Sequence, residues 1–159
     1  MKSSKPVFLF VGLGSVALLA AALYLQLVLK MLPCPLCVLQ RYAFAILAIC
    51  CLLGALMPRG AGGVAAGFGI VATLAGAATA GWHLYIKANP AISCGIDPLE
   101  TSLNTIPTAR MLPLLFQADG LCSTDYPPIL GLSIPQWSLL WFAVFAIALA
   151  TVLMRRRQR

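Results

Sequence analysis

The sequence predicts an all-α membrane protein, a bundle of four transmembrane helices with a long loop between the third and the fourth. Of the 159 residues, 61% are hydrophobic and only 9% are charged, whereas about a quarter of the residues of a soluble domain are charged. Four stretches are long enough to cross the apolar core of a bilayer, which takes about 20 residues. Nearly all charged residues lie between or outside these stretches.

The four expected helices are continuous apolar stretches. The first contains no charged residue, and the second contains only Arg41, close to one end. The third is uncharged apart from the titratable His83, and the fourth opens with Pro135, a favourable residue in a first helical turn. The first stretch is too long for a signal-peptide core and no small-residue cleavage site follows it, so we expect it to be retained. One transmembrane domain, residues 1–159, is expected to contain helices at approximately 6–29, 37–57, 60–86 and 134–154.

The third stretch indicates how the helices pack. Ala72, Gly76 and Ala80 recur every four residues and share one helical face. Small residues at this spacing allow helices to approach closely in lipid. We therefore expect a four-helix bundle, and the small-residue pattern says nothing about chemistry.

The charged residues indicate the orientation in the membrane. Those at the termini and between the second and third helices are all basic: Lys2, Lys5, Arg59, Arg155, Arg156, Arg157 and Arg159. All four acidic residues lie in the 87–133 loop, on the opposite side. The positive-inside rule therefore puts both termini in the cytoplasm and the loop outside. We interpret the arginine-rich tail as an anchor on anionic lipid and expect no nucleic-acid binding, despite the net charge of +7.

The loop over residues 87–133 contains six prolines, and we expect it to be largely irregular. One piece, around Ala109–Gln117, has large apolar residues at roughly helical spacing. It fits a short amphipathic helix lying in the membrane interface, and it fits a loop packed on the helix ends equally well.

Of the six cysteines, Cys50 and Cys51 lie within the second apolar stretch. Free cysteine behaves there as a small buried hydrophobe. Neighbouring residues on a helix point about 100° apart, so these two are poorly placed to bond to each other. We expect both to be structural.

Cys34 and Cys37 form a Cys-Pro-Leu-Cys motif at the outer start of the second helix. The helix dipole and the unpaired amides at this position stabilise a thiolate, the reactive form of cysteine. The motif therefore favours thiol–disulfide exchange over an inert bridge. Zinc is the rival, but it needs two further ligands. Cys94 and Cys122 are far apart in the sequence and the loop contains no histidine, so we expect no metal.

Cys94 and Cys122 both lie in the outer loop, where an oxidising compartment favours a disulfide between them. Spacing alone favours a structural bridge, worth about 2–4 kcal/mol. The Cys34–Cys37 pair on the same side raises a second possibility, a relay in which the two pairs exchange electrons.

Two titratable residues lie at the outer ends of helices. Arg41 follows Cys37 by about one turn, on the same face. It is placed either to snorkel as an interfacial anchor or to stabilise a Cys37 thiolate and the oxygen of a reducible ligand. His83 lies near the outer end of the third helix, where histidine either bonds to another helix or contributes to a ligand pocket.

Three stretches form a joint pattern: residues 34–42 (Cys-Pro-Leu-Cys-Val-Leu-Gln-Arg-Tyr), 120–122 (Gly-Leu-Cys) and 130–138 (Leu-Gly-Leu-Ser-Ile-Pro-Gln-Trp-Ser). This pattern, with His83 ahead of the loop and the lone Cys94 within it, resembles the disulfide bond formation protein B family. The resemblance covers nearly the whole chain, with the same helix order and loop lengths.

The resemblance implies a quinone-dependent thiol oxidase of the bacterial inner membrane. A periplasmic thioredoxin-like dithiol oxidase, reduced by its substrates, would attack the Cys94–Cys122 disulfide and form a mixed disulfide with Cys94. The released Cys122 would attack Cys34. The Cys37 thiolate would contact a quinone ring, and Arg41 would hold the quinone oxygen. The acceptor would be ubiquinone or menaquinone, which returns the electrons to the respiratory chain.

Redox potentials agree with this order. Strongly oxidising thiol proteins lie near about −120 mV, and couples near about −200 mV or below cannot keep them oxidised. Three alternatives remain open. One is a reductase like vitamin K epoxide reductase, although its Cys-x-x-Cys lies on a late helix. Another is a variant that serves a dedicated partner such as a sulfotransferase. The last is a non-enzymatic scaffold whose Cys94–Cys122 bridge only staples the loop.

Overall fold

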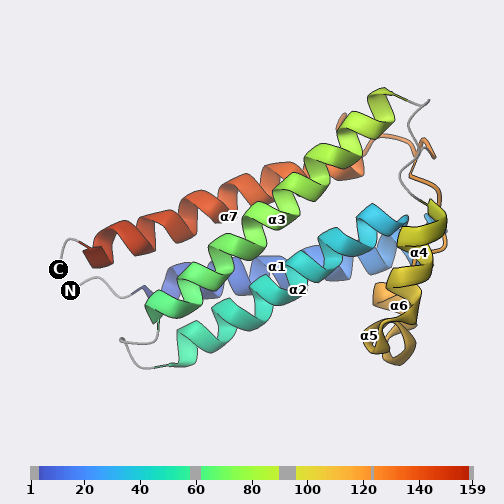
Figure 1. Ribbon diagram of the computed structural model, residues 1–159. Helices are drawn as coiled ribbons and strands as arrows, with labels where there is room; N and C mark the ends of the chain where they lie inside the picture. The colour runs from blue at the N-terminus through green and yellow to red at the C-terminus, as the bar shows by residue number, and fades with distance from the viewer. Residues whose placement is uncertain (1–3, 58–61, 90–95, 123, 158–159) are drawn as a thin grey trace.

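The computed structural model describes residues 4–57, 62–89, 96–122 and 124–157 (Figure 1). Within these ranges the secondary structure is helical, apart from an isolated backbone pairing of Ile129 with Leu132. In the described part of the chain, four helices are long and apolar enough to cross a membrane. They are α1 (Lys5–Leu27), α2 (Pro35–Leu56), α3 (Gly62–Ala88) and α7 (Ile134–Arg157). The predicted all-α fold with four membrane-length helices is confirmed.

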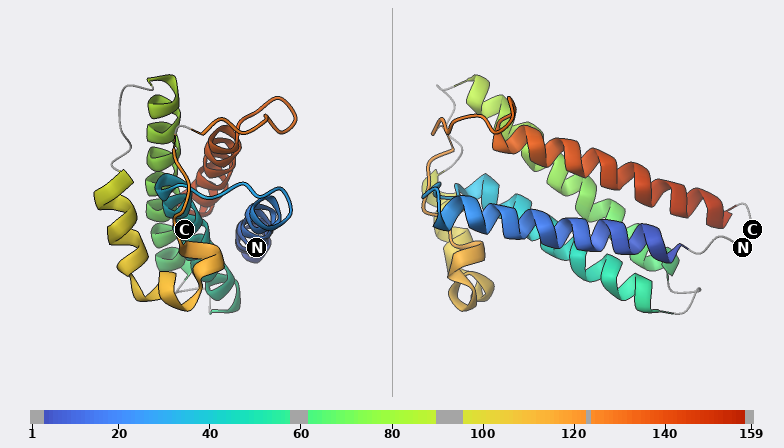
Figure 2. Two further views of the ribbon diagram at one scale, coloured as in Figure 1. Left: turned by 90° about the vertical axis from the view of Figure 1, so that its right-hand side faces the viewer. Right: turned by 180° about the vertical axis from the view of Figure 1, so that it is seen from behind.

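The four long helices pack in a definite order. α2 packs between α1 and α3, and α3 packs on α7, whereas α1 and α7 touch only sparsely. α1 begins and α7 ends at the same end of the bundle, and the described loop residues 96–122 lie at the other end (Figures 1 and 2). Lys5 and Arg155 therefore lie at the end opposite the loop.

The outer faces of the helices are apolar and exposed. Leu13 is 58% exposed, Phe68 65%, Val71 66% and Ile147 66%. Apolar surface of this extent is rare on a soluble monomer, and lipid chains can cover it. These side chains mark the faces that a bilayer would contact.

The interior combines aromatic rings with small residues. Phe44 of α2 stacks on Phe142 of α7, with ring centroids 4.2 Å apart. Ala72, Gly76 and Ala80 of α3 are all buried, as expected for a packing face. A Cβ atom at Gly76 would overlap the Phe142 ring, so the missing side chain of Gly76 is what admits this ring between the helices.

The loop is more helical than predicted. It contains α4 (Ile96–Thr105), α5 (Pro107–Met111) and α6 (Pro113–Phe116). The expectation of an irregular loop was wrong for residues 96–116, because Pro107 and Pro113 open helices, where a missing N–H costs nothing, and do not interrupt them. It is confirmed for residues 117–122 and 124–133, which contain no helix. The apolar piece 109–117 is helical in two parts. Leu112 breaks it, with φ −130° and ψ 63°, because a residue before proline is restricted from the α conformation.

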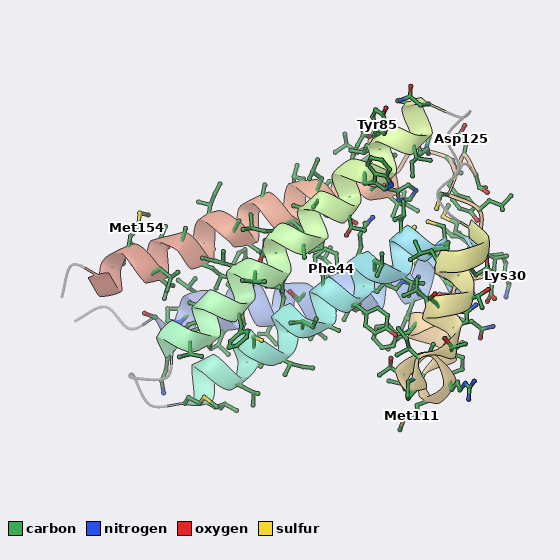
Figure 3. The ribbon with its side chains drawn as sticks, in the orientation of Figure 1. Lys30, Phe44, Tyr85, Met111, Asp125 and Met154 are labelled. Carbon is green, nitrogen blue, oxygen red and sulfur yellow. The ribbon has the colours of Figure 1, made fainter. Side chains whose placement is uncertain are left out.

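α5 and α6 pack one face on the first turns of α2. Phe116 is buried and stacks on Tyr42, with centroids 4.2 Å apart. The Tyr42 hydroxyl is 2.7 Å from the hydroxyl of Thr108. Met111 points away from the bundle and is 79% exposed (Figure 3). The location of this segment in a membrane interface stays a prediction.

Candidate active site

The Cys-Pro-Leu-Cys motif forms the first turn of α2. This helix begins at Pro35, which makes Cys34 the N-cap and puts Cys37 in the first turn. The Cys34 sulfur accepts a hydrogen bond from the Cys37 backbone N–H at 3.3 Å, and the two sulfur atoms are 3.0 Å apart. Both cysteines are free thiols. The arrangement is that of a reduced pair whose sulfur atoms are close enough to be joined by oxidation.

The environment of Cys34 holds a proton on the pair. The hydrogen bond to the Cys37 sulfur, together with burial, raises the pKa of the Cys34 thiol well above its ordinary value. Backbone N–H groups of Cys37 and Leu36 act in the opposite direction. Two buried sulfur atoms at this separation do not both carry a negative charge, since like charges in one site disfavour each other.

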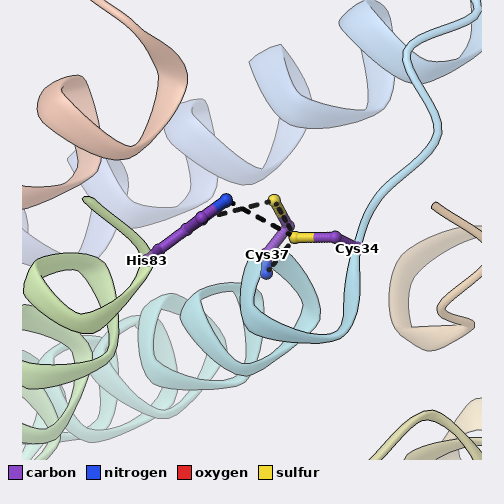
Figure 4. Close-up of side chains that lie close together, drawn as sticks. All are labelled: Cys34, Cys37 and His83. Atoms are coloured by element: carbon purple, nitrogen blue, oxygen red, sulfur yellow. Dashed lines mark hydrogen bonds between the residues drawn. The ribbon is translucent and has the colours of Figure 1, made fainter. Parts of the chain in front are cut away.

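His83 comes from α3 and lies beside both sulfur atoms (Figure 4). Its Nε2 is 3.8 Å from Cys34 Sγ, and its Nδ1 is 4.0 Å from Cys37 Sγ. Nε2 is also 3.3 Å from the backbone carbonyl oxygen of Cys122. The side chain is only 4% exposed. The imidazole is thus placed between the Cys34–Cys37 pair and the loop.

Gln40 is a buried polar residue that the sequence analysis did not identify. It is 3% exposed, and its amide nitrogen is 3.5 Å from His83 Nδ1. A polar side chain this deeply buried needs a hydrogen-bond partner, and the imidazole is one. In the sequence, its position three residues after Cys37, on the same helical face, could have indicated that Gln40 belongs to the site.

Arg41 connects α2 to two other elements. Its Nη1 donates to Gln26 Oε1 at 2.7 Å and to the carbonyl oxygens of Leu114 and Leu115 at 3.3 and 3.1 Å. Its Nη2 donates to the carbonyl oxygen of Ala22 at 3.3 Å. The guanidinium has five N–H hydrogens. The contacts within the described residues leave Nε and one hydrogen of Nη2 for a ligand.

Cys122 belongs to a loop segment that is fixed to the turn before α2. The backbone N–H groups of Asp119 and Gly120 donate to the Pro33 carbonyl oxygen at 3.1 and 3.0 Å. Gly120 has no side chain where the Leu32 carbonyl approaches, and a Cβ would collide with it. Cys122 therefore packs in one buried cluster with Cys34, Leu36 and Ile86.

The structure brings three of the four predicted redox cysteines to one place. Cys34, Cys37 and Cys122 lie together, and Cys122 is disulfide-bonded. Cys94, its predicted partner, lies outside the described residues. Cys50 and Cys51 are free thiols within α2; Cys51 is buried as expected, whereas Cys50 is only partly buried.

A cavity of about 330 Å³ adjoins these side chains. All four long helices contribute to its wall, including α1 and α7, which scarcely touch each other. The wall is mainly apolar, with aromatic rings from Phe44, Trp137 and Trp141. Its polar groups include Cys34, Cys37, Gln40, Arg41, His83 and Lys87. A volume in this range suits a small organic ligand.

Comparisons with known proteins show the family of the chain and agree with its fold. The model of the family described as disulfide bond formation protein DsbB matches residues 4–152. A relative from Herminiimonas arsenicoxydans, named disulfide bond formation protein B, is 60% identical over 99% of both chains. Proteins of the same name from Cupriavidus metallidurans and Burkholderia pseudomallei are 44% and 42% identical, over 98% and 100% of this chain and 96% and 95% of theirs.

Proposed function

Since the chain belongs to the family of disulfide bond formation protein B, we propose that it reoxidises a periplasmic thioredoxin-like dithiol oxidase and passes the electrons to a membrane quinone. Membership of this family establishes that the chain is a membrane protein that acts in disulfide bond formation. The partner, the quinone and the route of the electrons are our proposal. The observation that carries it is the joint burial of Cys122, which is disulfide-bonded, with Cys34 of the free pair.

The first transfer takes place in the loop. A thiolate of the reduced partner attacks the Cys94–Cys122 disulfide at Cys94, forming a mixed disulfide and releasing Cys122 as a thiolate. The second thiol of the partner then displaces Cys94, so that the partner leaves oxidised. The loop pair now carries the two electrons.

The second transfer takes place between the loop and α2. The Cys122 thiolate attacks Cys34 in the oxidised Cys34–Cys37 disulfide and releases Cys37. Cys94 then attacks Cys122, which regenerates the loop disulfide and leaves Cys34 and Cys37 reduced. The structure has the pair in this reduced form, with the sulfur atoms 3.0 Å apart.

The cavity fits the head group of a quinone. A planar ring with two carbonyl oxygens needs an apolar slot with few polar groups, and the wall combines aromatic rings with Cys37, Arg41 and His83. When bound, ubiquinone or menaquinone supplies the acceptor for two electrons and two protons. Cys37 would present its sulfur to the acceptor, the free N–H groups of Arg41 would donate to a quinone oxygen, and a nitrogen of His83 would hold or release a proton.

The charge distribution supports an orientation in the inner membrane with both termini in the cytoplasm. Lys5 and Arg155 lie at the end of the bundle opposite the loop, where the positive-inside rule expects basic residues. The loop then faces the periplasm, the compartment of the partner. In this proposal one transmembrane domain, residues 1–159, carries the whole relay.

The test is quinone reduction by the purified protein, with a reduced thioredoxin-like oxidase as the electron donor. We expect the wild type to consume quinone, Cys37→Ser and Cys94→Ser to be inactive, and Cys50→Ser, which changes a thiol outside the relay, to remain active. A wild type that leaves quinone untouched with a competent donor would overturn the proposal. A loop disulfide that resists mild dithiothreitol would favour a structural staple.

A further inference from the structure

Three metal-ligating side chains from the start of α2 and from α3 converge beside the cavity (Figure 4). One donor atom from each of Cys34, Cys37 and His83 lies within 4.8 Å of the other two. Cys34 and His83 are buried, and Cys37 is partly buried. The sequence predicted no metal because Cys94 and Cys122 are far apart and the loop contains no histidine, but the histidine beside the Cys34–Cys37 pair comes from α3.

We propose that the reduced Cys34–Cys37 pair and His83 bind one Zn²⁺ ion, which holds the pair in its reduced state. Two thiolates and one imidazole form a ligand set that zinc uses in sites that keep a fourth position open. Here the fourth position faces the cavity of about 330 Å³, which has room for a water molecule. Each cysteine binds as a thiolate, so the thiol protons are released to solvent when the ion enters.

The distances require two movements. The sulfur atoms must separate, and a single ring nitrogen, which lies within 4.8 Å of both sulfur atoms, must approach the more distant one by up to about 1.2 Å. With Zn–S bonds of about 2.3 Å and a Zn–N bond of about 2.0–2.1 Å, a tetrahedral site separates the sulfur atoms by about 3.8 Å and each sulfur from the nitrogen by about 3.6 Å. Cys34 Sγ is already 3.8 Å from His83 Nε2. The sulfur atoms, now 3.0 Å apart, must separate by about 0.8 Å. Cys34 precedes the helix, and rotation of its side chain can supply this movement.

The imidazole has a partner for whichever nitrogen does not bind the ion. Gln40 lies 3.5 Å from Nδ1, and the carbonyl oxygen of Cys122 lies 3.3 Å from Nε2. Such partners orient a ligating imidazole and typically contribute 10–100-fold to metal affinity. Gln40 is buried beside the ring, so it can support Nε2 ligation through its side-chain oxygen.

The positive charges around the cavity do not oppose the ion. Arg41 and Lys87 both line the same cavity. Zn²⁺ with two thiolates is neutral overall, so the bound ion adds no net positive charge beside these residues.

Zinc binding would be selective for the redox state. A disulfide between Cys34 and Cys37 has no thiolate to offer, so only the reduced pair binds the ion. While it is bound, neither sulfur is available to be oxidised or to exchange. Zn²⁺ would therefore inhibit quinone reduction, and this consequence rests on the proposed function.

The binding itself is tested without quinone or partner. The purified chain is reduced with dithiothreitol, desalted without oxygen and titrated with Co²⁺, whose sulfur-to-metal charge-transfer band reports thiolate ligands, and Zn²⁺ is then used to displace Co²⁺. We expect one Co²⁺ per chain. His83→Ala should weaken the affinity by more than roughly 100-fold, because losing a ligand exceeds the effect of losing its supporting partner. Gln40→Leu, which keeps all three donors, should weaken it by roughly 10–100-fold.

Cys50→Ser, which changes a free thiol of α2 that is not one of the three donors, is the matched control and should keep the wild-type affinity. Absence of the charge-transfer band in the wild type would overturn the inference. A band that neither His83→Ala nor Gln40→Leu weakens would also overturn it, because the ion would then bind the sulfur atoms alone. Binding without any quinone reduction would reject the proposed function and leave the metal site. Quinone reduction that Zn²⁺ does not affect, in a chain that binds no Co²⁺, would reject the metal site alone.

Discussion

Asn104 of α4 fixes the backbone of the segment that leads into Cys122. Its amide nitrogen donates to the Ala118 carbonyl oxygen at 3.0 Å, and its amide oxygen accepts from the Ala118 N–H at 2.9 Å. Ala118 is fully buried. Asn104→Ala therefore removes both bonds and leaves two backbone polar groups without their partner.

The expected size of the effect follows from these two bonds. Each contributes about 0.5–1.5 kcal/mol net, so the variant should destabilise the docked segment by about 1–3 kcal/mol. At about 1.4 kcal/mol per factor of ten, the equilibrium for local opening should rise roughly 5- to 150-fold. Four residues after Ala118, Cys122 would then spend more time away from Cys34, and transfer between the pairs should slow.

Hydrogen exchange of the backbone amides at residues 117–121, followed by mass spectrometry in detergent, measures the opening directly. Thr105→Ala is the matched control, because the Thr105 hydroxyl is exposed and donates to the Ser102 carbonyl oxygen of its own helix. Faster exchange in Asn104→Ala than in the control is expected. Equal exchange in the two variants, with unchanged quinone reduction, would refute the idea that this contact holds Cys122 in place.

Three further predictions concern other parts of the molecule. Arg41→Ala should raise the KM for quinone by about tenfold or more, the value of one charge-assisted hydrogen bond, with thiol exchange at the loop intact; an unchanged KM would remove Arg41 from the quinone site. The pKa of Cys34 is raised chiefly by its hydrogen bond to Cys37, so the rate of Cys34 alkylation should rise only at a pH higher than an ordinary thiol requires. Cys37→Ala should shift this pH–rate profile to lower pH, and identical profiles in the two proteins would contradict this cause. Gly76→Ala should lower the thermal stability in detergent by about 1–3 kcal/mol through overlap with an aromatic ring of α7, whereas Gly67→Ala, with open space around it, should not; equal stabilities would contradict the packing argument.

Local patterns were sufficient to predict the scaffold. Continuous apolar stretches identify the four long helices because lipid, unlike a soluble core, demands apolar side chains all around a helix. The Cys34–Cys37 motif could be recognised from the sequence equally well, because its two cysteines are three residues apart at the start of one helix. Even the small-residue face around Gly76 was visible, although the sequence does not reveal which ring fills it.

The contacts that complete the site depend on the tertiary fold. Gln40 looks like any polar residue near a helix end until α3 brings His83 against it. The partners of Arg41 include carbonyl groups of Leu114 and Leu115, more than seventy residues away. The position of Cys122 depends on how the loop docks, and prolines that open helices cannot be distinguished by composition from prolines that prevent them.

Whether Cys122 can reach Cys34 is tested most directly by trapping their bond. In the Cys37→Ser chain, Cys34 has lost its usual partner, and its thiolate can exchange with the disulfide of Cys122. Digestion without reduction, followed by mass spectrometry, should then yield a peptide pair linked through Cys34 and Cys122. Recovery of Cys122 linked only to Cys94 would contradict the relay.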